Sequence, residues 1–307
     1  MTCREVLRER ARGLGVRLVL PEGHDPRVQR AAEILARLGI AEPRLLGLEP
    51  ITPDNSPDLV AIADRLAQRR PRLAAGNQAL ALAADPIRFG AGLVALGLAD
   101  GCVAGVATAT ADVVRAALAL IGLAPGVSSA SAAMYLGLAD RTLTFTDVAV
   151  VPTPSVDQMA HAALAAARDR RALLGDEPVV AFLSYSTNGS AVGPEVDRMR
   201  AARDLFRALA PDIVADGEMQ LDAALVPGVA ARKWPSSEAA GRANVLVFPS
   251  LDAANIGYKL TERLAGASAA GPLLQGLAKP MSDLSRGADT DDIVDVAAMV
   301  ALQTSQP

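Results

Sequence analysis

The segment from residue 279 to residue 292 combines residue types that could hold an anion and move a proton. Ser285 and Arg286 follow Leu284, and Asp292 stands six residues after the arginine, in the expected first turn of the last helix. A guanidinium can bind phosphate through two parallel hydrogen bonds, and a carboxylate can accept a proton. The spacing fits a structural role equally well, with Asp292 completing a capping box and Arg286 as its surface partner.

A second polar segment, SYSTNGS at residues 184–190, lies between an expected strand and an expected helix start. Its hydroxyls and free backbone N–H groups could cradle an oxyanion. The same residue types also dominate ordinary turns, so a capped turn without a ligand is the alternative.

The elements that must position these residues are those of an α/β protein. Short apolar runs alternate with longer Ala-, Leu- and Arg-rich stretches of helical period. The expected strands cover residues 16–20, 101–107, 148–151, 179–184 and 244–248. Open α/β sheets bind ligands at such strand ends, which is where both polar segments lie.

Two helices are well defined by their starts and apolar faces. The last helix can be capped by Asp289 or Thr290, and a helix after residue 193 has Pro194 suited to its first turn. Their expected buried faces are Ile293, Val296, Ala297 and Val300 in the last helix, and Val196, Met199 and Leu205 in the other.

Composition excludes several classes of protein. The chain has 307 residues, enough for two packed domains, and its formal net charge of −4 gives no global attraction to nucleic acid or anionic membranes. Cys3 and Cys102 have no metal-type spacing and form no disulfide framework, which fits a reducing compartment. Charges throughout the first residues argue against an export signal, so we expect a cytoplasmic protein.

Residues 116–139 carry no charge and are long enough to span a bilayer. Their middle reads APGVSSAS, however, and this Pro-Gly-Ser cluster is typical of a loop between two buried elements. We therefore predict no membrane span.

Common catalytic groups are missing from the chain. His24 and His161 are its only histidines, which leaves little material for a histidine relay or a multi-histidine metal site. The glycine-rich fingerprints of dinucleotide and ATP binding are absent as well. We predict no metal site and no tightly bound cofactor.

Six motifs, in this order, resemble those of the phosphate acetyltransferases over nearly the whole chain. They are PEGHDPR at residues 21–27, ADGCVAG at 99–105, LSYSTNGS at 183–190, DGEMQLDAA at 216–224, FPSLDAANIGYK at 248–259 and GLAKPMSDLSRG at 276–287. The last three together are highly specific. The chain is therefore identified as a member of the phosphate acetyl/butyryl transferase family.

The resemblance implies two α/β domains with an interdomain cleft, in the architecture of the isocitrate and isopropylmalate dehydrogenases. The first domain would contain residues 1–124 plus 278–307, and the second residues 125–277. Enzymes of this family are typically homodimers, so we expect a homodimer here.

The resemblance also implies an activity: reversible transfer of an acetyl group between coenzyme A and inorganic phosphate, a reaction of acetate metabolism. Coenzyme A is then a substrate. Ser285 and Arg286 match the family's catalytic Ser-Arg pair, and Asp292 matches the base for the thiol. Arg115 matches a second site arginine, and Arg69, with Arg72 as the fallback, matches a third.

Further ligand contacts are expected at matching strand-end motifs, namely at Tyr185, Ser186, Thr187, Asn255 and Lys259. Four residues depart from the family pattern: Asn188 for Lys, Ser250 for Asp, Ala254 for Gly and Ser282 for Asn. They leave open a butyryl or other acyl substrate. A noncatalytic acyl-coenzyme A sensing module is another alternative, whereas a decarboxylating dehydrogenase would need an Asp cluster and a dinucleotide site that the sequence lacks.

Overall fold

The fold is mixed α/β with two sheets, as the alternating pattern predicts. The computed structural model describes residues 2–48, 52–73 and 78–305. The chain divides into two units. We call Glu5–Pro125 with Gly271–Pro307 the terminal unit, and Met1–Arg4 with Gly126–Ala270 the central unit.

The terminal unit contains a four-stranded sheet in the order β10-β3-β1-β2, in which every pair of neighbours is parallel. Its strands are β1 (Val16–Leu20), β2 (Ala41–Leu45), β3 (Gly101–Ala104) and β10 (Met281–Asp283). Its helices are α1 (Cys3–Ala11, which begins in the central unit), α2 (Pro26–Arg37), α3 (Leu59–Arg69), α4 (Gln78–Ala83), α5 (Pro86–Leu96), α6 (Thr110–Leu120) and α12 (Thr290–Thr304), with short 3-10 turns at Pro53–Asn55 and Pro71–Leu73.

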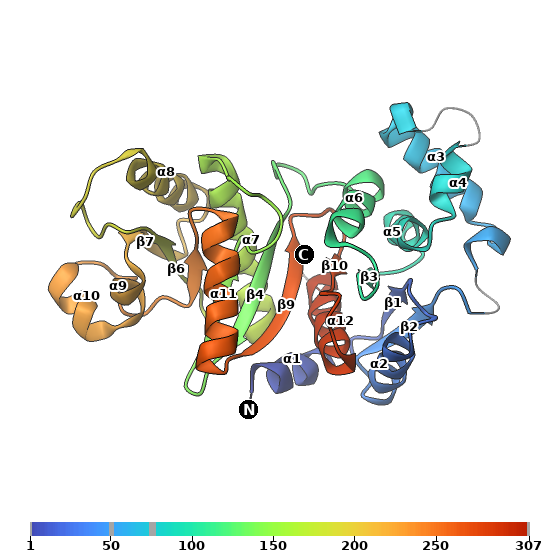
Figure 1. The fold of residues 1–307 in the computed structure, drawn as a ribbon, viewed down its shortest axis with the longest axis horizontal. Coiled ribbons are helices and arrows are strands. Elements are labelled where there is room, and N and C mark those ends of the chain that lie inside the picture. Colours follow the sequence, from blue (N-terminus) through green and yellow to red (C-terminus); the bar gives the residue numbers. More distant parts are fainter. Residues whose placement is uncertain (1, 49–51, 74–77, 306–307) are drawn as a thin grey trace. The chain divides into compact units, whose positions relative to one another are not determined.

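Helices cover both faces of this sheet. Figure 1 shows α5 and α6 on one side of the strands, and α2 and α12 on the other. The core between the sheet and α5 and α6 includes Val19, Phe89, Cys102 and Leu120, all fully buried. Because all four strands are parallel, their carboxyl ends lie at one edge of the sheet.

The central unit contains a six-stranded sheet in the order β7-β6-β8-β5-β4-β9. Its strands are β4 (Ser131–Gly137), β5 (Thr142–Thr146), β6 (Val179–Leu183), β7 (Val214–Met219), β8 (Val245–Val247) and β9 (Ser268–Gln275, which continues into the terminal unit from Gly271). Its helices are α7 (Val156–Leu174), α8 (Pro194–Leu209), α9 (Leu221–Leu225), α10 (Pro227–Lys233) and α11 (Leu251–Ala265). Strands β7, β6, β8 and β5 are parallel, and β4 pairs antiparallel to β5.

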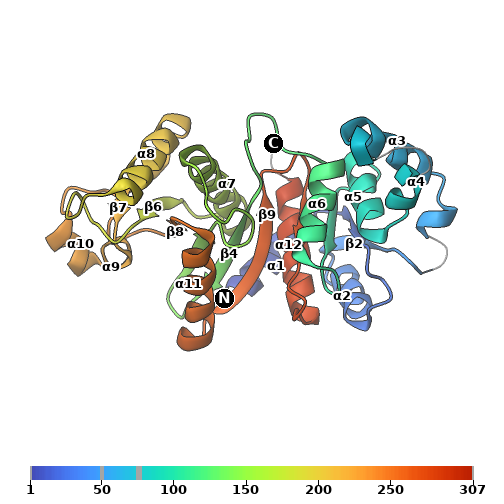
Figure 2. The same cartoon turned by 45° about the horizontal axis from the view of Figure 1, so that its top comes forward.

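Helices α7 and α8 pack on one face of the central sheet, and α11 lies on the other (Figure 2). Phe182 of β6 packs edge-on against Phe206 of α8, with ring centroids 5.8 Å apart. Met199 of α8 is fully buried in the same cluster. The predicted start of α8 at Pro194 is confirmed.

The expected strand at residues 148–151 is wrong, because these residues form a turn after β5. The Asp147 carboxylate accepts hydrogen bonds from the N–H groups of Ala149, Val150 and Val151. These donors are thus unavailable to a neighbouring strand. The expected strand at 101–107 also ends early, at Ala104, since a carboxylate takes the next N–H groups.

The apolar segment 116–139 contains the end of α6, an irregular stretch and the whole of β4, as the Pro-Gly-Ser cluster predicts. Within the described ranges, none of the helices has the length and apolarity needed to cross a membrane.

Candidate active site

Three loops meet at the carboxyl edge of the terminal unit's sheet. They follow β1, β3 and β10, which are neighbours in the sheet, and they comprise residues 21–25, 105–109 and 284–289. The loop after β10 contains Ser285 and Arg286. The predicted catalytic pair therefore lies where a parallel sheet binds its ligands.

Glu22 fixes the loop after β3. Its Oε2 accepts from the N–H groups of Gly105 and Val106, at 2.7 and 2.9 Å, and its Oε1 accepts from those of Ala107 and Thr108, both at 2.9 Å. The Thr108 hydroxyl donates to the same Oε1. These donors precede the start of α6 and would otherwise suit an anion. Glu22 satisfies them internally, so a phosphate must be bound by other groups.

Arg27 links the loops after β3 and β10. Its guanidinium pairs with Asp25 at 2.7 Å and donates to the carbonyls of Val106 at 3.2 Å and Ala288 at 2.8 Å. A weaker bond, at 3.5 Å, reaches the carbonyl of Arg286. Arg27 thus anchors the backbone of the turn that presents Ser285 and Arg286. Sequence reasoning missed both Glu22 and Arg27, although their motif directly follows an expected strand.

Ser285 and Arg286 are exposed on this turn. The Ser285 hydroxyl oxygen accepts a hydrogen bond from the N–H of Gly287 at 3.3 Å. Across the described ranges, the Arg286 side chain has neither an ion pair nor a hydrogen-bond partner, which does not support the alternative of a surface pair with Asp292. Its guanidinium is therefore available for an anion.

Asp292 occupies the capping box at the start of α12. Asp289 is the N-cap and accepts from the N–H of Asp292 at 2.8 Å, while the N–H of Asp289 donates to the Asp292 carboxylate at 3.1 Å. The predicted cap is confirmed. The Asp292 carboxylate accepts this hydrogen bond from Asp289, so Asp292 has the capping role that its spacing in the sequence allowed.

Asp283, the last residue of β10, is a buried carboxylate two residues before Ser285. Burial raises the pKa of this carboxyl to about 6, against the opposing hydrogen bonds from the Thr110 hydroxyl and the N–H of Leu284. Gly105, at φ +111°, packs against it so closely that a Cβ would overlap the carboxylate. The backbone at the end of β3 can therefore approach β10 only with glycine at this position.

Arginines gather around α6 in the terminal unit. Arg69 donates to the carbonyl of Ala119 at 3.0 Å, and Arg65, one turn earlier on α3, donates to the carbonyl of Leu120 at 2.7 Å. Arg115 lies one turn before Ala119 on the same face of α6, is exposed, and pairs with Asp112 at 2.5 Å. The structure thus brings Arg69 and Arg115 to one helix. The fallback Arg72 is exposed on the following 3-10 turn.

In the central unit, the loop after β6 is folded around Glu218. Its carboxylate accepts from the Ser186 hydroxyl at 2.8 Å and the N–H of Gly189 at 2.9 Å, and pairs with Arg200 at 2.6 Å. Burial alone would raise the pKa of Glu218, but these hydrogen bonds outweigh it and lower the pKa to about 2. The ionised carboxylate of Glu218 therefore lies at the centre of this loop and accepts its hydrogen bonds.

The predicted ligand contacts in this loop have different surroundings. Ser186 and Thr187 are buried, and Thr187 bonds Gln220 through its hydroxyl. Tyr185 is 59% exposed. Of these three residues, only Tyr185 presents its side chain to solvent. The hydroxyls of Ser186 and Thr187 bond within the protein, as expected for a capped turn without a ligand.

Asn255 and Lys259 lie one turn apart on α11. The Asn255 amide donates to the carbonyl of Val148 at 3.2 Å, whereas the exposed Lys259 ammonium lies over the Tyr258 ring, 4.9 Å from its centroid. The two side chains therefore have different surroundings, one turned to the 148–151 turn and the other to solvent.

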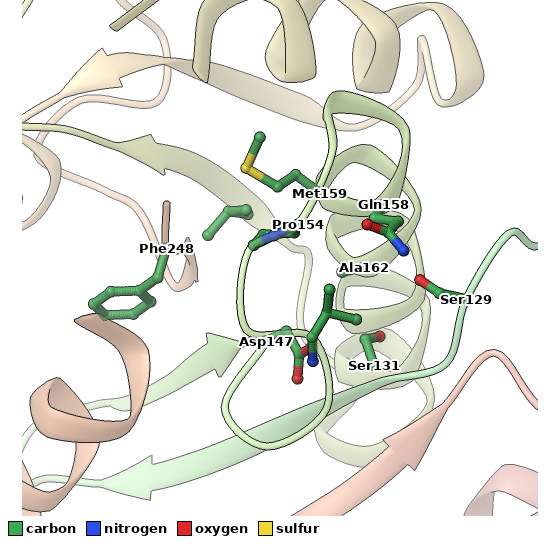
Figure 3. A pocket seen from close by; sticks show the side chains of 10 residues that line it. Ser129, Ser131, Asp147, Pro154, Gln158, Met159, Ala162 and Phe248 are labelled. Carbon is green, nitrogen blue, oxygen red and sulfur yellow. The ribbon is translucent and has the colours of Figure 1, made fainter. Parts of the chain in front are cut away.

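A small pocket in the central unit adjoins this turn (Figure 3). Ser129, Ser131 and Gln158 line it with Asp147, and Phe248 and Met159 supply apolar walls. The Asp147 carboxylate is buried, and burial raises its pKa despite the backbone N–H groups that bond it. The pocket lies at the carboxyl ends of β5 and β8, beside the FPSLDAANIGYK motif.

Comparison with known proteins decides the family. The profile described as phosphate acetyl/butaryl transferase matches residues 2–301. A phosphate acetyltransferase of Paracoccus denitrificans is 46% identical, over 97% of this chain and 98% of its own. The chain belongs to the phosphate acetyl/butaryl transferase family.

Solved structures within this family have the same fold. A phosphotransacetylase from Streptococcus pyogenes superposes with a TM-score of 0.93 at 37% identity, covering 99% of both chains. The phosphate acetyltransferase of Thermoanaerobacterium thermosaccharolyticum is 42% identical over 96% of this chain and 97% of its own. The family resemblance inferred from the motifs is confirmed.

The four residues that depart from the family pattern have different local surroundings. Asn188 has a φ of 48°, a left-handed conformation that Asn tolerates better than most residues. Ser250 is the N-cap of α11 and accepts from the N–H of Ala253. Ala254 is buried within that helix, and Ser282 bonds the backbone of Pro272 and Leu274.

Groups for other catalytic strategies are not assembled in the described ranges. No cluster of three or more His, Cys, Asp or Glu side chains there could hold a metal ion. Cys3 and Cys102 are buried, and burial raises the pKa of the Cys102 thiol far above its usual value.

Proposed function

We propose that this protein is a phosphate acetyltransferase, which moves an acetyl group between coenzyme A and inorganic phosphate in both directions. One observation carries the proposal: Arg286 is exposed at the carboxyl edge of a parallel sheet, on a turn anchored by Arg27, in a family named for this reaction. An unpaired arginine there suits bidentate binding of phosphate.

The chemical step we propose is direct. Coenzyme A thiolate attacks the carbonyl carbon of acetyl phosphate, the new carbon–sulfur bond forms, and phosphate leaves with the electrons of the broken carbon–oxygen bond. Arg286 and Ser285 stabilise the phosphate and the developing oxyanion, with Arg115 as a further cation. No covalent enzyme intermediate is required, in keeping with a buried Cys102 whose thiol has a raised pKa.

Asp292 is the base in this proposal, and its task is demanding. Moving a proton from a thiol to an ordinary aspartate is uphill by roughly 6 kcal/mol in water. The arginines lower this barrier by stabilising the thiolate and the phosphate. The capping bond from Asp289 uses one carboxylate oxygen, and the proposal requires the carboxylate to accept the thiol proton as well.

Substrate binding is proposed at Arg69, Arg115, Tyr185, Ser186, Thr187, Asn255 and Lys259. Because the hydroxyls of Ser186 and Thr187 are buried, these two residues would contribute to substrate binding through the shape of the loop and through its backbone N–H groups. The dehydrogenase-like architecture, the interdomain cleft, the boundaries near residues 124 and 278, the homodimer and the cytoplasmic location are further parts of the proposal.

The test compares acyl donors directly. Phosphate-dependent release of coenzyme A thiol is measured with acetyl-, propionyl- and butyryl-coenzyme A, each with and without phosphate. We expect the highest kcat/KM with acetyl-coenzyme A. A preference for butyryl-coenzyme A would place the chain in the butyryl branch, and no release with any donor would overturn the enzymatic proposal in favour of a sensing module.

A further inference from the structure

Asp283 is a buried carboxylate for which the mechanism above has no use. It is 1% exposed, and its Oδ1 atom has no hydrogen-bond partner among the described residues. The Oδ1 atom faces the backbone of Gly105 so closely that a side chain there would overlap it. A buried polar atom without a partner costs stability, and native proteins retain such a group where function requires it.

Asp283 lies close to the proposed catalytic pair. Its side chain points to the same side of the sheet as that of Met281, which is buried in the core cluster with residues of α5 and α6. Ser285 follows two residues later, so the Cα atoms of Asp283 and Ser285 are at most about 7 Å apart. The carboxylate is therefore next to the turn that presents Arg286.

Thr110, the first residue of α6, connects Asp283 to the surface. Its hydroxyl donates a hydrogen bond to the Asp283 carboxylate. Thr110 itself is only half-buried, whereas Asp283 is enclosed. A hydroxyl that donates its own proton still has lone pairs with which it can accept another hydrogen bond. Thr110 can therefore accept a hydrogen bond from a ligand while it donates to Asp283.

The start of α6 also has free donors beside that hydroxyl. No side chain caps the helix, since Ala109 occupies the N-cap position. Glu22 accepts from the N–H groups of residues 105–108, but those of Thr110 and Ala111 have no acceptor in the part of the chain that the structure describes. N–H groups at the start of a helix bind anions. Thr110 thus offers an N–H to a phosphate oxygen and a hydroxyl oxygen to a phosphate proton.

We propose that Thr110 and Asp283 form a relay that takes the proton of bound phosphate during acetyl transfer, an inference that rests on the proposed function. Thr110 contacts the phosphate and is the catalytic residue of the relay. Asp283 acts through Thr110, holds its hydroxyl in position and receives the proton. In the reverse direction the same two residues return the proton to the departing phosphate.

The proton transfers balance over the whole reaction. A phosphate oxygen attacks the carbonyl carbon of acetyl-coenzyme A, the new carbon–oxygen bond forms, and the thiolate leaves with the electrons of the carbon–sulfur bond. The proton of a remaining P–O–H group moves to the Thr110 oxygen while the Thr110 proton moves to Asp283. Asp292 gives its proton to the thiolate. One proton has then left phosphate and one has reached the thiol, as the net reaction requires.

The charges around Asp283 favour this transfer. Burial, with a smaller contribution from the neighbouring Glu22 carboxylate, raises the pKa of Asp283 to about 6. A phosphate bonded to carbon through one oxygen loses its last proton at a similar pH, about 6, so the proton can pass between them at little cost. The Cys102 thiol of β3 does not compete for this role, because burial raises its pKa far above the usual value.

The first test separates activity from stability. Asp283→Asn keeps the size of the side chain but cannot take up a proton, so kcat for acetyl phosphate formation should fall about 100-fold or more. The same variant should melt at a higher temperature than the wild type, because a neutral amide is easier to bury than a carboxylate. A purely structural role would make the variant lose stability and activity together.

The second test concerns the hydroxyl. Thr110→Val removes it with little change in shape and should lower kcat by a similar factor, whereas Thr110→Ser keeps it and should stay within about fivefold of wild type. Thr304→Val is the matched control, because Thr304 is also half-buried and its hydroxyl donates to the Ala301 carbonyl at the other end of α12 from Asp292. It should leave kcat unchanged.

The pH dependence of kcat gives a readout that a structural role would not change. With saturating phosphate, wild-type kcat should fall as the pH drops below about 6, because a protonated Asp283 cannot accept a second proton. In Asp283→Asn this decline should be absent, since the group that titrates has been removed.

Two results would overturn the relay and leave the proposed function standing. One is an active wild type together with an equally fast Asp283→Asn or Thr110→Val enzyme. The other is an Asp283→Asn enzyme that is slower, less stable than wild type and still shows the decline below about pH 6. A wild type that forms no acetyl phosphate from acetyl-coenzyme A and phosphate would instead overturn the proposed function, and the relay with it.

Discussion

Asp289 and Asp292 hold each other at the start of α12, each bonding the other's backbone N–H, at 2.8 and 3.1 Å. The Asp292 carboxylate therefore caps α12, and the proposed function also makes it the base for the thiol proton. The two roles separate experimentally, because an asparagine oxygen can accept the capping bond but cannot take up a proton at neutral pH.

Asp292→Asn should lower kcat by a factor of about 100 or more, the usual contribution of a general base, and leave the melting temperature nearly unchanged. Asp289→Asn is the matched control, since it alters the same capping box without touching the proposed base. It should retain most of the activity. Equal losses in both variants would show that the cap, and not proton transfer, is what matters.

Arg27 should act through position and not through substrate contact. Arg27→Ala removes the bonds to the Val106 and Ala288 carbonyls, so the turn with Ser285 and Arg286 loses its anchor. We expect kcat to fall about tenfold or more, since misplacement by an ångström is costly in catalysis. Added guanidinium should restore part of kcat.

Arg30→Ala is the control for Arg27→Ala, because Arg30 is on the same helix and forms an exposed ion pair with Glu33. It should behave as wild type. An Arg27→Ala enzyme with normal kcat would contradict the positioning role.

The loop around Glu218 should make stability depend on pH. The folded pKa of about 2 is lower than the ordinary value of 4.5, so this stabilisation is full above about pH 4.5 and is lost as pH falls toward 2. Glu218→Gln should therefore cost about 3 kcal/mol of unfolding free energy at pH 7, and less at pH 3. Urea unfolding at both pH values measures this, and a loss of equal size at both would contradict it.

Ionisation of Asp283 should have the opposite effect on stability to that of Glu218. Its folded pKa of about 6 exceeds the ordinary 3.8, so the ionised form destabilises the fold, and the penalty develops as pH rises from about 4 to above 6. Asp283→Asn should raise the unfolding free energy by on the order of 2 kcal/mol at pH 7 and by little at pH 4. A variant less stable than wild type at pH 7 would contradict this sign.

Local patterns in the sequence predicted much of the fold. The strand at residues 16–20 and the starts of α8 and α12 follow from apolar period, Pro at the first turn and an Asp cap, all of which act within a few residues. The turn at 148–151 was mistaken for a strand because its residues are apolar. Their backbone N–H groups donate to the Asp147 carboxylate and not to a neighbouring strand.

The arrangement of the site depends on bonds between distant segments, which local patterns do not show. Glu22 bonds residues 83 to 86 positions away, and Arg27 bonds the carbonyl of Ala288, 261 positions away. The burial of Ser186 was likewise hidden, because Glu218 lies on another strand. The resemblance to a family located the motifs in the sequence. The structure shows which side chains fix the loops of these motifs through hydrogen bonds.

The most direct test of acetyl transfer at Arg286 is the reverse reaction, with formation of acetyl-coenzyme A from acetyl phosphate and coenzyme A followed for wild type, Arg286→Ala and Arg30→Ala. We predict rapid formation by wild type and Arg30→Ala, and a loss of about 1,000-fold or more in kcat for Arg286→Ala, as for removal of a main oxyanion-stabilising group. An Arg286→Ala enzyme as fast as the wild type, or a wild type that forms no acetyl-coenzyme A, would contradict the account.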